Sequence, residues 1–400
     1  MNIYDRYLPQ LVSDYSGLHS LLYHLPTSII LLSPSGCNQP IREVDEYRDF
    51  SNTNQYTTKL DDAQVTLGIE GIINEKLLSN MERDVEFIAV MGTAITDIIG
   101  TDLGVVSQKI ESISGKPVVF FNTNGFKAYP KAIAQAYLQI LPFIVEKDPS
   151  GDKKKVNLIG FHPLVHGSDK FLVQFLDTFH HDQIEFCLPG FDCFGKAHAK
   201  LSKSAYISII LSEEGVKLGE KLKEADGVPY EKLLPISKSG MKDLIRVLEE
   251  YTGETYPEMD QEEDYYFKKQ GNAKKVLIIG EPFFAAFLRK ALQKDFGLDE
   301  VQILSLLPKE NFSKDKLSEA LYEDIFFDTH EDKFLGRIQA ADLIIGDPLL
   351  RETIPQISEK TFIEIPYFGL SGREYAKIPY DYIGIKGFEY FKRQLIITGR

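Results

Sequence analysis

The stretch Ser28-Ile29-Ile30-Leu31-Leu32-Ser33-Pro34-Ser35-Gly36-Cys37 decides the fold, because a short and wholly apolar run ends there in a turn rich in Ser, Pro and Gly. Similar apolar runs occupy residues 86–91 and 117–121, and a polar loop at 123–126 precedes a helical pattern at 130–141. Apolar runs of this length predict strands that are buried on both faces. Because they alternate with helices, they predict a parallel sheet covered by helices on both sides.

This alternation of strand and helix restarts twice along the chain. A polar break at residues 148–155 precedes a new strand at 156–160, and an acidic break at 256–264 precedes a third unit. That third unit opens with a strand at 274–280 and contains a later one at 341–346. The pattern predicts an α/β protein with three doubly wound, Rossmann-like parallel-sheet domains around a central cleft. The expected domains are residues 1–152, 153–270 and 271–400.

Composition and charge exclude several classes of protein. The 400 residues include 45 Lys and Arg against 59 Asp and Glu, and the net charge of −14 disfavours a nucleic-acid partner. No apolar run approaches the ~20 residues that cross a bilayer, so no membrane association is expected. The N-terminus has no signal-peptide pattern, and three cysteines cannot form a disulfide framework. These features predict a cytoplasmic protein.

Ligands of open parallel sheets bind beyond the carboxyl ends of the strands. This rule selects four segments, at residues 33–37, 92–97, 161–167 and 187–193. The side chains that we expect to line a substrate cleft are Thr93, Asp97, Cys187 and Cys193. The chain contains neither a Walker A sequence nor a G-x-G-x-x-G fingerprint, and Gly280-Glu281-Pro282 has one glycine where that fingerprint needs three. A G-x-S-x-G elbow and an H-E-x-x-H helix are also absent.

Histidine and cysteine side chains are the main candidates for chemistry. His162 and His166 are four residues apart and are candidates for proton transfer or metal contact, although Pro163 places His162 in the loop. The alternative is that they only begin a helix or line a cleft. The spacing of Cys187 and Cys193 fits no zinc knuckle, so a purely structural role stays open for both. Cys37, in a turn at a strand end, is the best reactive candidate, and an inert thiol is its alternative.

The order of the motifs resembles the nitrogenase component 1 family, which includes nitrogenase molybdenum–iron protein subunits and the catalytic subunits of dark-operative protochlorophyllide reductase. Residues 33–37 resemble the family's G-P-x-G-C element, and residues 60–71 its acidic and glycine-containing segment. Residues 93–102 resemble the element that ends I-I-G-D-D, and residues 117–126 match P-V followed by G-F. Residues 379–389 resemble the family's C-terminal P-Y…G-F element. The resemblance spans nearly the whole chain.

This resemblance implies an iron–sulfur cluster at a subunit interface, held by cysteines on three loops. Of these positions only Cys37 carries a thiol, with Gly36 beside it in the cluster loop. Ala94 replaces a second cysteine, and Ser16-Gly17 stands where a third is expected. One thiolate cannot hold a 4Fe–4S cluster, so Cys37 would be a metal ligand only in a cluster shared between subunits. Leu211 falls where the active-site cofactor's cysteine would be, and the region of 371–373 lacks the cofactor's histidine, so no molybdenum cofactor is expected.

Three hypotheses follow for function. The first is a nitrogenase-like oxidoreductase component, a homodimer or a heteromer with a cysteine-rich homologue, which receives electrons from an ATP-dependent iron–sulfur reductase. Its substrate would lie between the domains, with His162 and His166 as catalytic residues and His162 as proton donor. The second is a non-catalytic scaffold, carrier or structural partner that lost the cluster ligands. The third is a small-molecule-binding module without redox chemistry.

Overall fold

The structure is a computed structural model. It describes residues 1–39, 41, 45–46, 48, 54–74, 78–79, 81, 84–146, 153–190, 197–257, 275–312, 320–375, 377 and 382–398. The domain boundaries expected near 152 and 270, and the candidate Cys193, lie outside the described residues, so these predictions stay untested.

The first domain is built on a four-stranded sheet in the order β2-β1-β3-β4, with every pair of strands parallel. Its strands are β1 (Thr27–Leu31), β2 (Gln55–Thr57), β3 (Phe87–Met91) and β4 (Val118–Phe121). Alternate residues of β1 and β3 pack on opposite sides, against α1 (Asp14–Leu22) and α6 (Tyr129–Gln139) on one face and α5 (Leu103–Ser114) on the other. Shorter helices are η1 (Ile3–Asp5), α2 (Asp62–Leu67), η4 (Glu70–Ile72), α4 (Ala94–Ile98) and α7 (Leu141–Ile144).

The second domain has a parallel sheet in the order β6-β5-β7-β8. Its strands are β5 (Lys154–Ile159), β6 (Ile184–Cys187), β7 (Ile207–Ile210) and β8 (Tyr230–Lys232). Helices α9 (Lys170–Thr178) and α11 (Ser237–Thr252) pack on one face of this sheet, and α10 (Val216–Asp226) packs on the other. The short helices α8 (Pro163–His166) and η6 (Glu213–Gly215) begin at the carboxyl ends of β5 and β7.

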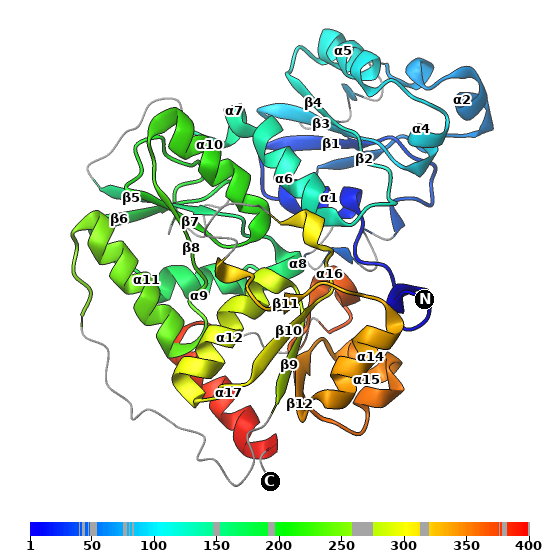
Figure 1. The fold of residues 1–400 in the computed structure, drawn as a ribbon. Coiled ribbons are helices and arrows are strands. Elements are labelled where there is room, and N and C mark those ends of the chain that lie inside the picture. Colours follow the sequence, from blue (N-terminus) through cyan, green and yellow to red (C-terminus); the bar gives the residue numbers. More distant parts are fainter. Residues whose placement is uncertain are drawn as a thin grey trace.

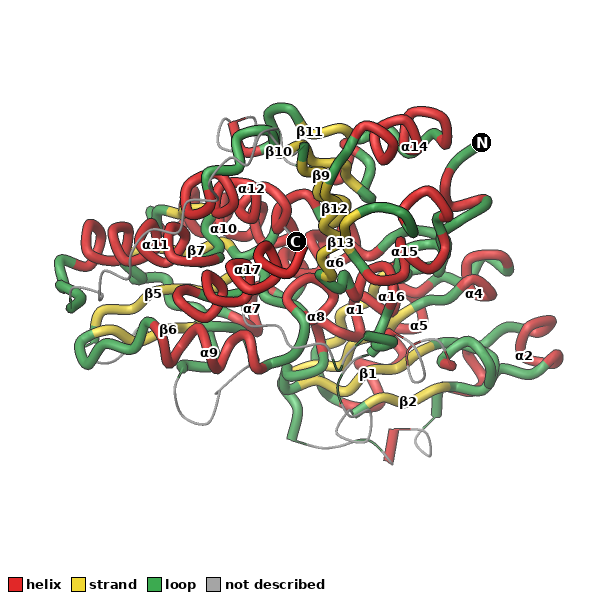
Figure 2. Tube along the Cα trace, turned by 90° about the horizontal axis from the view of Figure 1, so that it is seen from below, coloured by secondary structure: helices red, strands yellow, loops and turns green. Residues whose placement is uncertain are grey.

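The third domain has five parallel strands in the order β11-β10-β9-β12-β13. These are β9 (Val276–Gly280), β10 (Val301–Ser305), β11 (Ile325–Phe326), β12 (Leu343–Gly346) and β13 (Thr361–Glu364). Figure 2 shows α12 (Pro282–Phe296) on one side of this sheet and α14 (Glu331–Ala340) and α15 (Pro348–Thr353) on the other. The remaining helices are η7 (Lys309–Asn311), η8 (Pro355–Ile357), α16 (Phe368–Ser371) and α17 (Gly384–Thr398).

The three domains meet where α6, α8 and α16 converge, near the centre of Figure 1. One continuous apolar cluster contains Tyr129 of the first domain, Leu164 of the second and Phe368 of the third. The last helix, α17, returns to pack against α11 of the second domain and stacks Phe388 on Phe296 of α12. The prediction of three parallel-sheet α/β domains is therefore confirmed. Within the described ranges, no helix is both long and apolar enough to cross a membrane.

Candidate functional site

The carboxyl ends of strands from two sheets point into the junction of the domains. The loops after β5, β7, β9 and β13 contribute buried polar side chains to this junction. These side chains lie next to two tyrosines of α6. The set is His162, His166, Glu213, Glu214, Glu281, Tyr129, Tyr137 and Tyr367, and each of these residues is almost completely buried. Burial of so many ionisable groups costs free energy unless they are paired, so the pairing decides what the site can do.

His162 and Glu214 form the central pair of this junction. Nε2 of His162 lies 3.4 Å from a carboxylate oxygen of Glu214, and their side chains are 0% and 2% exposed. The ring of Tyr129 packs edge-on against His162 at 5.4 Å between centroids. Burial alone would raise the pKa of Glu214, but the His162 imidazole outweighs it and holds that pKa below its usual value. Neither ring nitrogen of His162 makes a hydrogen bond that meets the usual geometry, so the 3.4 Å approach of Nε2 to Glu214 is a long contact rather than a well-formed hydrogen bond.

His166, in contrast, is fixed by the backbone. Its Nε2 lies 2.9 Å from the Leu211 carbonyl oxygen, and its Nδ1 lies 3.3 Å from the His162 amide nitrogen. Burial lowers the pKa of His166 to about 4, so the ring is neutral at pH 7. The neutral tautomer that suits these partners carries its proton on Nε2, donates it to Leu211 and accepts from His162 at Nδ1. His166 therefore holds the loop that carries His162.

Two further carboxylates complete the junction. Glu213 accepts a hydrogen bond from the Tyr322 hydroxyl at 2.6 Å and lies 3.7 Å from Nζ of Lys232. Glu281 begins α12 and accepts from the amides of Phe283 and Phe284 at 2.9 and 2.7 Å. Desolvation, and then the charge of Glu214, raise the pKa of Glu281 to about 8 in spite of those two hydrogen bonds.

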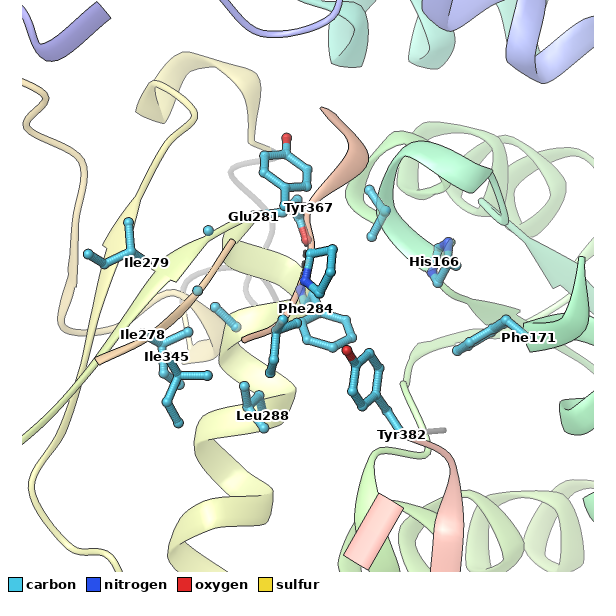
Figure 3. A pocket seen from close by; sticks show the side chains of 16 residues that line it. His166, Phe171, Ile278, Ile279, Glu281, Phe284, Leu288, Ile345, Tyr367 and Tyr382 are labelled. Atoms are coloured by element: carbon cyan, nitrogen blue, oxygen red, sulfur yellow. Dashed lines mark hydrogen bonds between the residues drawn. The ribbon is translucent and has the colours of Figure 1, made fainter. Parts of the chain in front are cut away.

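A small cavity of about 30 Å³ opens between the second and third domains, beside Glu281. Figure 3 shows His166 and Phe171 on its second-domain side, and Glu281 and Tyr367 on its third-domain side. The rest of its wall is mainly apolar, from β9, α12, β12 and the loop after β13. Among the described residues that line this cavity, Glu281 is the only acidic one.

The sequence rules did not select Glu213, Glu214 or Glu281. A signal was present, since Gly280-Glu281-Pro282 and Gly346-Asp347-Pro348 both follow buried strands. In each case the carboxylate caps the next helix, at the position where a phosphate-binding loop would need glycine. These side chains accept hydrogen bonds from amides at the helix starts, which a bound nucleotide phosphate would need for itself.

The first domain brings other predicted residues together at the carboxyl edge of its own sheet. Thr93 is buried and donates to the Leu32 carbonyl oxygen at 2.8 Å, and Asp97 accepts from Nδ2 of Asn124 at 3.3 Å. Cys37 is half-buried in the turn after β1, and burial raises the pKa of its thiol. Thr93 and Asp97 do not line the cavity beside Glu281, and their expected cleft role stays a prediction.

Cys37 has a polar neighbourhood of its own. Burial, and then the charges of Cys37 and Asp45, raise the pKa of Tyr15 above its usual value. Ser16 makes a hydrogen bond with Asp45, whose pKa burial raises to about 6. Gly36 is exposed, and an added Cβ there would meet no atom within 4 Å. Among the described residues, nothing therefore covers Gly36 in the Cys37 turn.

Cys187 lies apart from both groups. It is buried at the end of β6, its Sγ is 3.9 Å from the Glu185 carbonyl oxygen, and burial raises its pKa to about 12. The buried pair Lys155–Glu146, with 2.8 Å between Nζ and the carboxylate oxygen, lies in the same region. Cys187 does not line the cavity, and the part assigned to it in a substrate cleft is an untested prediction.

An iron–sulfur cluster needs several thiolates, and the family positions in this chain supply few of them. Cluster iron is held by thiolates, commonly four. Near the Cys37 turn the family positions carry Ser16 and Ala94, and the described part of the chain contains no group of three His, Cys, Asp or Glu side chains placed to hold a metal ion. Of the family positions that resemble cluster ligands, only position 37 carries a thiol in this chain.

Comparisons with known proteins give the family and the fold. The family model described as nitrogenase component 1 type oxidoreductase matches residues 26–373. A solved structure described as nitrogenase Cp1 at pH 6.5 superposes with a TM-score of 0.66 and 15% identity, covering 98% of this chain and 92% of that one. Nitrogenase Cp1 at pH 5 gives a TM-score of 0.67 and 16% identity, covering 98% and 89%. No curated protein sequence matches.

Proposed function

Because the chain belongs to the nitrogenase component 1 type oxidoreductase family, we propose that it is a redox subunit that shares an interfacial iron–sulfur cluster through Cys37. The second subunit is either another copy of this chain or a homologue that carries more cysteines. Electrons come from an ATP-dependent iron–sulfur reductase, and the assembly works in the cytoplasm. The resemblance inferred from the sequence motifs is confirmed at the level of the family.

The placement of Cys37 is the observation that carries this proposal. Its thiol is half-buried in a turn at the surface of the first domain, next to the exposed Gly36, so a partner subunit can reach it. Cys187 is less suited to this part, since it is buried at the end of β6 and burial raises its pKa to about 12. Iron binding displaces the thiol proton, so the raised pKa of Cys37 makes cluster assembly favoured at higher pH.

The junction supplies groups suited to reductive chemistry, which consumes protons as well as electrons. His162 is buried and paired with Glu214, and an imidazole is the side chain most often used to transfer protons. His166 supports that role by holding the loop of His162. We keep His162 as the candidate proton donor, and we assign His166 to positioning rather than to proton transfer.

A second candidate function is that of a non-catalytic scaffold, carrier or structural partner. Ser16 and Ala94 favour it, because they occupy two family positions where thiolates would hold the cluster. Such a subunit would keep the fold and the partner interface and bind no iron.

The experiment is anaerobic purification of the tagged chain from the organism that makes it, so that native partners remain bound. Iron, acid-labile sulfide and the stoichiometry of co-purifying subunits are measured. The redox proposal expects iron and sulfide in similar amounts, and a visible absorbance that bleaches with the reductase and ATP. Stable partner complexes without iron would support the non-catalytic subunit instead.

A further inference from the structure

Glu281 and Asp347 directly follow β9 and β12, which are neighbouring strands of the third sheet. Each follows a strand that ends in glycine, precedes a proline and caps the next helix. Their surroundings differ. Asp347 accepts hydrogen bonds from groups of its own domain, Leu349 N, Tyr367 N and the Ser371 hydroxyl. Glu281 faces the second domain, where the charges of Glu213 and Glu214 act on it.

Among the described residues, the carboxylates of the junction differ in their basic partners. Glu213 has Lys232 at 3.7 Å and the Tyr322 hydroxyl, and Glu214 has His162 at 3.4 Å. Glu281, which is 4% exposed, has only the two backbone amides of α12, and no basic side chain of the described residues lies within ion-pair distance of it. An ionised carboxylate that is buried without a basic partner costs free energy, so burial favours the protonated form of Glu281.

We propose that the second and third domains are held together by one proton, carried by the buried Glu281 at the cavity between them, and that loss of this proton at alkaline pH loosens the junction. The inference concerns this chain alone and needs neither iron nor a partner subunit. Because Glu281 lines the cavity between these two domains, loosening would widen that cavity. Protonation of Glu281 would thus control how far the cavity between the two domains opens.

The other groups that face the junction do not titrate in the same way. The hydroxyls of Tyr129, Tyr322 and Tyr367 have pKa values raised well above 10, first by burial, so they stay protonated. His166 stays neutral, because burial lowers its pKa to about 4. His162 contacts Glu214, and Lys232 contacts Glu213, so neither neutralises Glu281 directly.

The direction of the pH dependence follows from proton linkage. Burial and the charge of Glu214 raise the pKa of Glu281 to about 8, whereas an unfolded glutamate titrates near ~4.3. Between these values the folded chain binds a proton that the unfolded chain does not, so stability falls as pH rises and becomes level above the folded pKa. Asp347, with a pKa of about 6, contributes the same trend only at lower pH.

The test measures thermal unfolding and hydrogen–deuterium exchange of the full chain at pH 6.5 and pH 9, with exchange times corrected for intrinsic rates. The variants are Glu281→Gln, Asp347→Asn as the matched cap control, and His162→Gln to isolate the other titratable group. In the wild type we expect the unfolding temperature to be lower at pH 9 than at pH 6.5. We also expect hydrogen exchange to become at least tenfold faster at pH 9 in two peptides. One peptide contains β9 and the start of α12, and the other contains β7 and η6. Glu281→Gln should remove both effects, and Asp347→Asn and His162→Gln should keep them.

An unchanged pH dependence in Glu281→Gln would overturn the proposal, as would equal loss of the effect in Asp347→Asn. If Glu281→Gln does not fold, the wild type decides the question by infrared spectroscopy. A buried carboxylic-acid C=O band that disappears between pH 7 and pH 9 supports the proposal, and the absence of any such band contradicts it.

Discussion

Nε2 of His162 and a carboxylate oxygen of Glu214 lie 3.4 Å apart, with both side chains at most 2% exposed, at the junction of the three domains. The residues come from the loops after β5 and β7, which are neighbouring strands of the second sheet. The first prediction concerns this pair. His162→Leu leaves a buried carboxylate without its partner, so it should lower the free energy of unfolding by about 3–5 kcal/mol.

The double variant His162→Leu/Glu214→Gln should recover at least half of that loss, because no unpaired charge remains. Chemical denaturation of both variants and of Glu214→Gln completes the cycle. Additive effects of the two substitutions would show that the pair is not coupled.

His166 should give a pH dependence in the acidic range. Its folded pKa is about 4, lowered by burial, so the unfolded chain binds more protons between pH 4 and pH 6.5. Stability is therefore lost as pH falls through this window, by at most about 1.4 kcal/mol per pH unit from this one group. Between pH 6.5 and pH 4.5, the free energy of unfolding should fall less in His166→Gln than in the wild type. Urea unfolding at both pH values measures this difference. Parallel pH profiles would contradict this assignment.

The glycines of the first domain differ in what they tolerate. A Cβ at Gly17 would lie 2.3 Å from Cβ of Tyr129, whereas at Gly36 it would meet no atom within 4 Å. Gly17→Ala forces α1 away from α6 and should cost about 1–3 kcal/mol. Gly36→Ala, the matched control in the Cys37 turn, should change stability by less than about 0.5 kcal/mol. Similar unfolding midpoints for the two variants would refute the packing argument.

The described cysteines should differ in reactivity. Cys37 is half-buried, and Cys187 is buried with a pKa of about 12. The thiolate is the nucleophile, so iodoacetamide at pH 8 should label Cys37 at least tenfold faster than Cys187 in the folded Cys193→Ser variant. Peptide mass spectrometry measures both rates, and unfolding in urea provides the control in which they become equal. Faster labelling of Cys187 would mean that its surroundings open in solution.

Much of the fold was predictable because buried parallel strands are almost continuous apolar runs. Residues 28–32, 86–91 and 276–280 gave β1, β3 and β9 in this way. The short edge strands β8 and β11 carry no such run, since Tyr230–Lys232 is polar and Ile325–Phe326 spans two residues. The return of α17 to the second domain depends on packing between distant segments, which periodicity does not reveal.

The candidate site was only partly predictable. The rule that strand ends carry ligands placed His162 and His166 at the junction, because that rule depends on local sequence alone. It did not show that His162 would pair with Glu214, since that pairing depends on the register of β5 against β7. Glu281 was missed because its neighbours belong to a different domain, and its unusual pKa arises only when the second and third sheets come together.

The most direct test of the proposed redox role is the iron content per chain in the anaerobically purified assembly, compared among the wild type, Cys37→Ala and Cys187→Ala. Both variants remove one thiol, but only Cys37 lies in a turn that a partner can reach. The account predicts that Cys37→Ala loses the iron and its visible absorbance, and that Cys187→Ala keeps most of both. Unchanged iron in Cys37→Ala would contradict the shared-cluster role of Cys37.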